Sequence, residues 1–251
     1  MKNNLAIYPS LQDKVVFVTG GASGIGKEIV EAFAAQSAHV GLVDFDVKGG
    51  EALAAQYENV AFEAVDLRDI EGLKRAFENL KKRIGAAEIL VNNAARDDRH
   101  DWKDVTSEYW DERMATNLKH MFFAMQAVAP DMIKAGYGSI INMSSNSWLE
   151  SVGGFPAYAT AKAAVHGLTR TMARDLGQHH IRANIVVPGW IMTDRQKELW
   201  VTPEKLAAHL EGQCLPDPID PIHVARMVLF LGSDDSQMCT GGEFRVDAGS
   251  I

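Results

Sequence analysis

Two side chains in the third quarter of the chain have types and spacing suited to acid–base chemistry. Tyr158 and Lys162 lie four residues apart, inside a stretch from Pro156 to Gln178 whose pattern predicts a helix. Residues at this spacing share one helix face, one turn apart. A free tyrosine, with a pKa of about 10, is a poor base at neutral pH, but a nearby cation favours the phenolate. Tyr158 is therefore a candidate general base for an alcohol. The spacing alone also fits an amphipathic tyrosine beside a surface lysine.

Other polar residues follow predicted strands. Ser145 comes just after the apolar run Ser139–Met143, so its hydroxyl could orient a substrate oxygen beside Tyr158. Asn93 and Ala94 end another strand, and Pro188-Gly189 ends a third. In open α/β sheets, ligands bind at the carboxyl ends of the strands. These residues are therefore expected to meet in one site.

A glycine-rich turn joins the first predicted strand to the first helix, with the sequence Thr19-Gly-Gly-Ala-Ser-Gly-Ile-Gly26. Gly20 permits a tight turn, Gly24 allows close approach of a pyrophosphate, and Gly26 allows the helix to pack on the strand. Together with Ser23 and Ile25, they form a helix N-terminus that offers free N–H groups to phosphates. Placed between a strand and a helix, the cluster predicts dinucleotide binding. The alternative is that the glycines serve only the turn.

An acidic residue follows at the end of the second predicted strand. Asp44 lies eighteen residues after Gly26, where a carboxylate can hydrogen-bond both ribose hydroxyls of adenosine and repel a 2′-phosphate. Asp46 adds negative charge nearby, and no arginine or lysine follows at once. NAD is therefore favoured over NADP.

The elements that must position these residues alternate along the chain. Strands are predicted at 14–19, 39–44, 59–65, 88–92, 139–143, 181–187 and 243–246, and helices at 24–36, 69–84, 156–178 and 203–211. Continuous apolar strands alternating with helices predict an α/β fold: one Rossmann-like, doubly wound domain over residues 1–251, with a seven-stranded, mostly parallel sheet and helices on both faces. The proline-rich stretch 190–221 is either a lid over the site or a plain surface excursion.

Composition narrows the class of protein. The net charge is -8 and the basic residues are dispersed, which argues against a nucleic-acid or anionic-membrane partner. Cys214 and Cys239 show neither a disulfide framework nor metal-ligand spacing, so no metal site is expected. Residues 1–9 lack the apolar region of a signal peptide, and no run is long enough to span a bilayer. These features predict a cytoplasmic protein.

Taken together, the motifs resemble those of the short-chain dehydrogenase/reductase family over essentially the whole chain. The motifs are Thr19-Gly-x3-Gly-Ile-Gly26, Asn92-Asn-Ala94, Asn117, Ser145, Tyr158-x3-Lys162 and Pro188-Gly189. In the family the serine stands thirteen residues before the tyrosine, as Ser145 does here.

The resemblance implies further roles. Asn117 is expected to interrupt a helix and to hold a water that relays protons through Lys162. Asp66 and Leu67 would border the adenine, while Ile191 and Thr193 would meet the nicotinamide amide. The resemblance also suggests a homotetramer built on the long helices after Asp104 and around Tyr158.

The chain departs from the family pattern at two places. Ala95 stands where the family usually has glycine, which could crowd the backbone near the cofactor. Asn146 and Ser147 follow the serine, where the family commonly has apolar residues, and polar side chains there suggest a polar substrate.

Other segments are similar to bacterial sugar 1-dehydrogenases of this family, including Ala6–Leu11 and Asp97–His100. This implies oxidation of the C1 hydroxyl of a cyclic aldose, of the D-xylose, L-arabinose or D-galactose class, to an aldonolactone. The candidate substrate contacts are Arg96, Ser145, Asn146, Ser147, Trp148, Tyr158 and Trp190. The tryptophans could stack on the C–H face of a sugar, or could belong to the core or a subunit interface. Residues 97–100 could equally be a charged surface loop.

Two other functions remain open. The first is another enzyme on the same scaffold, acting on a 3-oxoacyl thioester, a secondary alcohol or a sugar acid. The second is a non-catalytic nucleotide-binding scaffold protein, because fold does not fix function.

Overall fold

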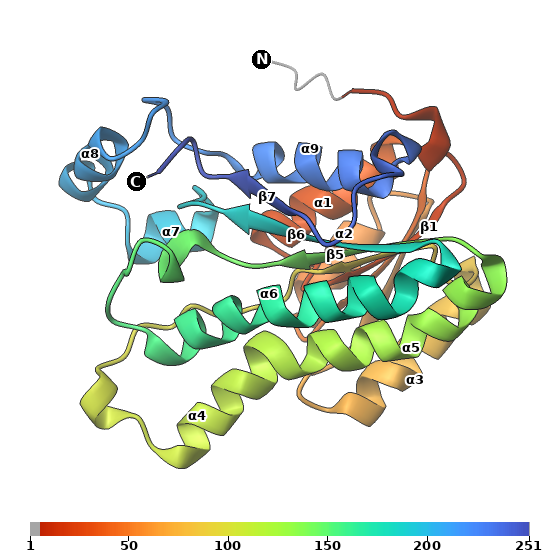
Figure 1. Cartoon of the computed structure of the whole chain (residues 1–251), viewed down its shortest axis with the longest axis horizontal. Helices are drawn as coiled ribbons and strands as arrows, with labels where there is room; N and C mark the ends of the chain where they lie inside the picture. The colour runs from red at the N-terminus through yellow and green to blue at the C-terminus, as the bar shows by residue number, and fades with distance from the viewer. Residues whose placement is uncertain (1–5, 251) are drawn as a thin grey trace.

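One parallel sheet organises residues 6–250, the part of the chain that the computed structural model describes (Figure 1). The prediction that residues 1–9 are not a signal peptide therefore lies partly outside the described residues. The strand order is β3-β2-β1-β4-β5-β6-β7, and every neighbouring pair is parallel. The strands are β1 Val15–Thr19, β2 His39–Asp44, β3 Val60–Ala64, β4 Ile89–Asn92, β5 Gly138–Met143, β6 Ile181–Pro188 and β7 Glu243–Val246. The predicted doubly wound α/β fold is confirmed.

Helices cover both faces of the sheet. They are α1 Gly24–Ala35, α2 Val47–Ala54, α3 Ile70–Ile84, α4 Ser107–Met114, α5 His120–Ala135, α6 Pro156–Leu176, α7 Asp194–Leu199, α8 Pro203–Glu211 and α9 Pro221–Gly232. Helices α1 and α9 pack together on one face, and α3, α5 and α6 lie on the other (Figure 1). None of the helices described is long and apolar enough to cross a bilayer.

The alternation of strand side chains divides the core into two layers. Val16 and Val18 of β1 pack into one apolar cluster with Phe33 of α1. Phe17 points the other way and lies 5.1 Å, centroid to centroid, from Phe77 of α3. Successive strand residues face opposite sides, so a strand covered on both faces must be apolar at every position. This explains the apolar run of β1 from Val15 to Val18.

The strand order reverses beside β1. The chain runs outward from β1 to β2 and β3, then returns to place β4 on the other side of β1. Helices on opposite faces of the sheet follow β1 and β4, which opens a crevice at their carboxyl ends. The glycine turn and the Asn92–Ala94 segment both lie at this position.

Helix boundaries differ from the prediction in two respects. Helix α6 ends at Leu176, and a 3-10 turn continues from Gly177 to His179, where the sequence predicted unbroken helix to Gln178. Helices α2, α7 and α9 were not predicted. Each of α2 and α7 is short, and the side chain of the residue before it caps its N-terminus, Asp46 for α2 and Thr193 for α7.

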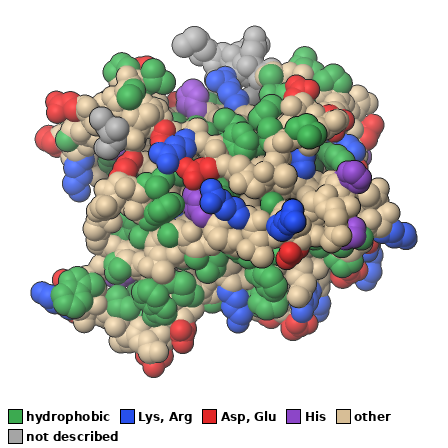
Figure 2. Space-filling model, viewed as in Figure 1, with side chains coloured by type: hydrophobic (Ala, Val, Ile, Leu, Met, Phe, Trp, Pro, Cys, Tyr) green, Lys and Arg blue, Asp and Glu red, His purple; other side chains and the backbone are tan. Residues whose placement is uncertain are grey.

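The surface carries charges of both signs. On the face shown in Figure 2, lysine and arginine side chains are interspersed with aspartate and glutamate and with apolar groups. Charge on the face shown is therefore mixed in sign rather than gathered into a basic stripe of the kind that binds nucleic acid.

Candidate active site

A cleft of about 1600 Å³ lies at the carboxyl ends of the strands. It is lined by every residue that the sequence predicted to bind a cofactor: Gly20, Ser23, Gly24, Ile25, Gly26, Asp44, Asp66, Leu67, Asn93, Ala94, Tyr158, Lys162, Pro188, Gly189, Ile191 and Thr193. The fold therefore brings together residues that are spread over most of the chain.

The glycine turn packs directly against the end of β4. Gly20 has a φ of +66°, which side-chain-bearing residues rarely adopt, and a Cβ there would lie 2.7 Å from the Cα of Ala94. Asn93 secures the contact, because its Nδ2 donates hydrogen bonds to the carbonyl oxygens of Thr19 (3.2 Å) and Gly20 (2.8 Å). Asn93 thus shapes the cofactor cleft by holding the turn against β4.

Helix α1 begins at this turn with its N-terminus uncapped. Ser23 occupies the N-cap position, and its side chain accepts no hydrogen bond from the first turn. The first N–H groups of a helix have no partner within the helix and attract anions. An uncapped N-terminus that faces the cleft fits the pyrophosphate of a dinucleotide.

Asp44 is held in a fixed orientation at the end of β2. Its two carboxylate oxygens accept hydrogen bonds from the backbone N–H groups of Ala22 and Asp46, both at 3.0 Å. The side chain is 7% exposed and lines the cleft. A carboxylate keeps further acceptor sites after two such bonds, so Asp44 can still receive ribose hydroxyls.

Ala95, at the position of the family glycine, fits without strain. It is not among the described residues with positive φ, so the backbone there does not demand glycine. Its side chain is exposed and lines the cleft. The methyl group therefore faces open space rather than the turn.

The predicted reactive side chains lie together. Tyr158 and Lys162 are on one face of α6, with the Lys162 Nζ 5.7 Å from the centroid of the Tyr158 ring. Lys162 Nζ donates a hydrogen bond to the Met143 carbonyl oxygen (2.8 Å), and the Ser144 hydroxyl donates one to the Lys162 carbonyl oxygen (2.8 Å). These two bonds fix α6 to the end of β5. Ser145, which follows, lines the same cleft as Tyr158.

Burial changes the acidity of both groups. Removal from water raises the pKa of the Tyr158 phenol, and the negative charge of Asp97 raises it further, while the Ser145 hydroxyl lowers it. Burial also lowers the pKa of Lys162 to about 7, and Asp97 opposes this shift. The protein groups alone therefore favour the phenol, in contrast to the lowered pKa expected from the spacing of the two residues.

Asn117 lies in a π-helical segment, Ala115–Lys119, between α4 and α5. Its Oδ1 accepts a hydrogen bond from the Arg96 backbone N–H (2.8 Å), and its Nδ2 donates one to the Arg113 carbonyl oxygen (3.0 Å). The expected helix interruption is present. The side chain does not line the cleft and instead fixes the loop after β4, so its proton-relay role stays a prediction.

Most of the predicted substrate residues line the cleft: Arg96, Ser145, Asn146, Ser147, Tyr158 and Trp190. Trp148 does not, which favours the alternative that it belongs to the core or to a subunit interface. Asn146–Trp148 form a 3-10 turn, in which successive side chains point about 120° apart, so Trp148 diverges from the two residues before it. Its ring packs edge-on against His166 of α6, with the centroids 5.0 Å apart.

Several cleft residues were not assigned by the sequence. Asp97 and Arg99 come from the loop after β4, Arg195 and Gln196 from α7, and Trp200 from the turn that follows α7. Arg99 lies over the Phe155 ring, 3.8 Å from its centroid. The signal available was the charged run Asp97–His100 directly after a strand end, which was left open as a surface loop.

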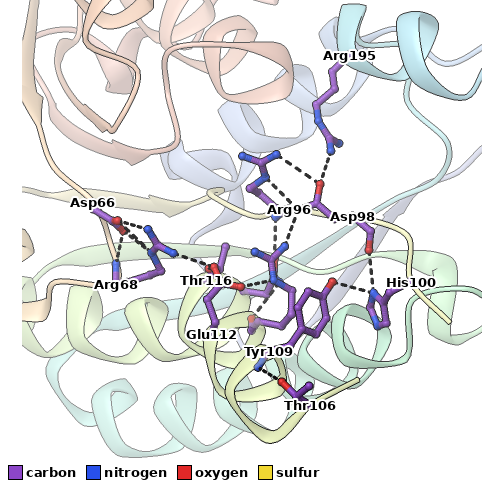
Figure 3. Close-up of polar contacts among 12 residues, drawn as sticks. Asp66, Arg68, Arg96, Asp98, His100, Thr106, Tyr109, Glu112, Thr116 and Arg195 are labelled. Carbon is purple, nitrogen blue, oxygen red and sulfur yellow. Dashed lines mark hydrogen bonds and ion pairs between the residues drawn. The ribbon is translucent and has the colours of Figure 1, made fainter. Parts of the chain in front are cut away.

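Ion pairs connect the two ends of the cleft (Figure 3). Arg68, which pairs with Asp66 at the predicted adenine end, also contacts Glu112 (3.0 Å). The remaining links are Glu112–Arg113, Arg113–Asp98 (2.6 Å) and Asp98–Arg195 (2.7 Å). Arg113 is only 8% exposed. The series of ion pairs thus connects the segment after β3 with α4 and α7.

Comparison with known proteins agrees with this geometry. A family profile described as Enoyl-(Acyl carrier protein) reductase matches residues 20–250. D-xylose 1-dehydrogenase of Caulobacter vibrioides is 46% identical over 97% of this chain and 98% of its own length. Probable galactose dehydrogenase GalD of Rhizobium meliloti (strain 1021) is 44% identical over 96% of each chain.

Solved structures show the same architecture. A short-chain type dehydrogenase/reductase from Mycobacterium ulcerans superposes with a TM-score of 0.91 at 27% identity, covering 96% of this chain and 90% of that one. A 3-oxoacyl-[acyl-carrier protein] reductase with bound NAD from Brucella melitensis gives a TM-score of 0.88 at 27% identity, covering 97% and 93%. The chain belongs to the short-chain dehydrogenase/reductase family, whose cofactor is a nicotinamide dinucleotide.

Proposed function

We propose that this protein oxidises the C1 hydroxyl of a cyclic aldose to the aldonolactone, with NAD as the oxidant. The observation that carries the proposal is the joint position of Tyr158, Lys162 and Ser145 in a cleft whose mouth is polar. The two curated relatives described above are named for sugar oxidation, which supports an aldose as substrate.

The chain's residues divide the reaction between them. Ser145 orients the C1 oxygen, and Tyr158 takes its proton as general base. A nicotinamide dinucleotide held in this cleft would supply the hydride acceptor for the C1–H bond and a positive ring charge that would favour the Tyr158 phenolate. Lys162, anchored to Met143, stabilises the negative phenolate oxygen and binds the nicotinamide ribose.

The cofactor preference rests on Asp44. Its fixed carboxylate can accept both ribose hydroxyls of adenosine and would repel a 2′-phosphate, which supports NAD over NADP. Asp66 and Leu67 would border the adenine, and Ile191 and Thr193 the nicotinamide amide.

Three further features belong to the same proposal. Both cysteines, Cys214 and Cys239, are free thiols, which supports a reducing, cytoplasmic location.

The segment 190–221 acts as a lid, supported by the contacts of α7 with the loop after β4. The assembly is a homotetramer, for which apolar residues exposed on α5 are the support.

The test is a panel of D-xylose, L-arabinose, D-galactose, D-glucose and L-fucose, each assayed with NAD and NADP by absorbance of the reduced cofactor. We expect kcat/KM to be highest for one pentose or hexose of this set with NAD. Turnover of a 3-oxoacyl thioester without turnover of any aldose would contradict the substrate assignment. Equal efficiency with NADP would remove the role given to Asp44.

A further inference from the structure

One carboxylate in the cleft has no role in the proton and hydride transfers described above. Asp97 lies in the loop after β4, and its side chain is 20% exposed. Its Oδ1 accepts a hydrogen bond from Arg195 Nη1, and its Oδ2 accepts one from Gln196 Nε2 at 2.8 Å. Both donors belong to α7, so Asp97 is held from the lid side of the cleft.

The orientation of Gln196 is fixed as well. Its Oε1 accepts a hydrogen bond from Trp190 Nε1 (2.9 Å), which leaves the amide nitrogen to face Asp97. The Trp190 ring packs edge-on against His209 of α8, 5.1 Å between centroids. Trp190, Gln196 and Asp97 thus form a connected set in which the carboxylate cannot rotate without breaking two hydrogen bonds.

Two protein donors do not occupy all the hydrogen-bond acceptor sites of the Asp97 carboxylate. An ionised aspartate offers about four acceptor sites and no donor. Arg195 and Gln196 occupy two of them, and Asp97 lines the cleft together with Tyr158. The unused acceptor sites are therefore available to a group that donates a hydrogen bond from within the cleft.

The charge of Asp97 acts on the reacting pair. It raises the pKa of Tyr158, second only to burial, and it is the one charged side chain that acts on the pKa of Lys162. The geometry of its loop agrees, because Arg99, two residues further on, lies 3.8 Å from the centroid of the Phe155 ring, which packs against Tyr158 at 5.5 Å. Asp97 therefore belongs to the reactive end of the cleft.

We propose that Asp97 is a specificity-determining residue that accepts a hydrogen bond from the substrate hydroxyl next to the one being oxidised. The inference rests on the proposed function, because a cyclic aldose carries this donor at C2, beside the reacting C1. A 3-oxoacyl thioester has an apolar methylene beside its reacting carbon and would leave the carboxylate without a donor. Sites built to hydrogen-bond a hydroxyl strongly reject analogues that lack it.

The experiment compares an aldose with its 2-deoxy analogue. With the wild-type enzyme and NAD, using the best aldose of the panel, we expect kcat/KM to fall about 10- to 100-fold when the C2 hydroxyl is removed, the usual effect of losing a hydrogen bond to a charged group. In Asp97→Asn, kcat/KM for the aldose should fall by a similar factor relative to the value for the 2-deoxy sugar, so that the ratio of the two values approaches one. The ratio cancels the effect of the lost charge on Tyr158, which both sugars share.

Asp98→Asn is the matched control. Asp98 is the neighbouring acid and pairs with the same Arg195 (2.7 Å), but it also pairs with Arg113 and does not line the cleft. If these acids only tie α7 to the loop after β4, both variants should lose activity equally on the two sugars. A loss confined to the hydroxylated sugar in Asp97→Asn alone supports direct contact.

The outcomes separate this inference from the proposed function. A wild-type enzyme that oxidises the aldose and its 2-deoxy analogue equally well would overturn the role of Asp97 and leave the aldose assignment standing. This comparison needs no variant, so it decides the question even if Asp97→Asn fails to fold. A wild-type enzyme that oxidises no aldose would remove both proposals.

Discussion

At the scale of single residues, burial favours the neutral form of both members of the reacting pair. Removal from water keeps the Tyr158 phenol neutral and brings the pKa of Lys162 to about 7, so Lys162 is only partly charged at neutral pH. A base that is protonated in the free protein can still act once a positive charge is bound beside it. The site therefore couples base strength to occupancy of the cofactor cleft.

Tyr158→Phe is expected to abolish turnover while cofactor binding is retained. The substitution removes the hydroxyl that takes the proton and keeps the ring, which packs edge-on against Phe155 at 5.5 Å. Removal of a general base typically lowers the rate by 10²- to 10⁴-fold. The measurements are kcat for the best aldose and cofactor Kd by quenching of tryptophan fluorescence. Substantial retained activity with normal folding would refute the assignment of the base.

Lys162 should make the stability of the cofactor-free protein rise with pH. Its folded pKa, about 7, lies below the value of 10.5 in the unfolded chain, so the unfolded state binds more protons between these values. Stability is then lowest below pH 7 and increases toward pH 10. Lys162→Met removes this group and should flatten the dependence, by at most about 5 kcal/mol across the window.

Thermal melting of both proteins at pH 6.5, 7.5, 8.5 and 9.5 provides the check. The difference in Tm, variant minus wild type, should be most positive at pH 6.5 and should shrink steadily with increasing pH. Parallel pH profiles for the two proteins would show that Lys162 stays charged when buried.

At the scale of elements, the sequence predicted the parts that follow from local pattern. The strands β2 and β7 and helix α8 match the predicted ranges, because apolar runs bounded by turn residues, or a proline at the first helical position, mark them locally. The glycine turn was recognisable because its backbone geometry demands particular residues.

What could not be predicted depends on contacts between distant segments. Helix α7 is six residues long, and its Arg195 and Gln196 side chains bond to the loop after β4, almost a hundred residues earlier. Trp148 was a candidate because a tryptophan can stack on the C–H face of a sugar, but a single 3-10 turn directs it toward α6. Neither the contacts of α7 nor the direction of the Trp148 side chain is marked by a periodic pattern in the sequence.

Gly26→Ala should damage the cofactor cleft. An added Cβ would collide with the carbonyl oxygen of Gly20 and approach Asn93 Nδ2 to 2.5 Å, so the turn must separate from β4. Overpacking of this kind costs about 1–3 kcal/mol. We expect a lower Tm and a Kd for the cofactor raised at least about tenfold.

Gly167→Ala is the matched control for this variant. Gly167 lies within α6, and a Cβ there meets nothing within 4 Å. Alanine is favoured over glycine inside a helix by about 0.5–1 kcal/mol, so this variant should be as stable as the wild type or more so. Similar losses of cofactor affinity in both variants would contradict the close-packing role of Gly26.

At the scale of the whole molecule, a series of ion pairs connects one end of the cleft to the other. The path from Asp66 through Arg68, Glu112 and Arg113 to Asp98 reaches α7 at Arg195 (Figure 3). Most of these pairs are partly exposed, and exposed pairs contribute little to stability individually. Their consequence is positional, because one network contacts residues at the adenine end and at the lid.

Exposed apolar side chains on α5 indicate how copies of the chain associate. Phe122 and Ile133 lie on α5, three helical turns apart and so on nearly the same face, and their side chains are 39% and 40% exposed. Exposed apolar groups aligned on one helix face are typical of an interface between subunits. A homotetramer that uses this face would bury them.

The prediction is a change of mass in solution. Light scattering after size exclusion should give the wild-type protein four times the 27.5 kDa chain mass. The double variant Phe122→Asp with Ile133→Asp should shift to smaller species, because burial of two carboxylates against a partner costs several kcal/mol. Leu215→Asp, which changes a 62% exposed residue after α8, should leave the mass unchanged. A wild-type mass of one chain at micromolar concentration would contradict the tetramer, while a stable tetramer of the double variant would place its interface on another face.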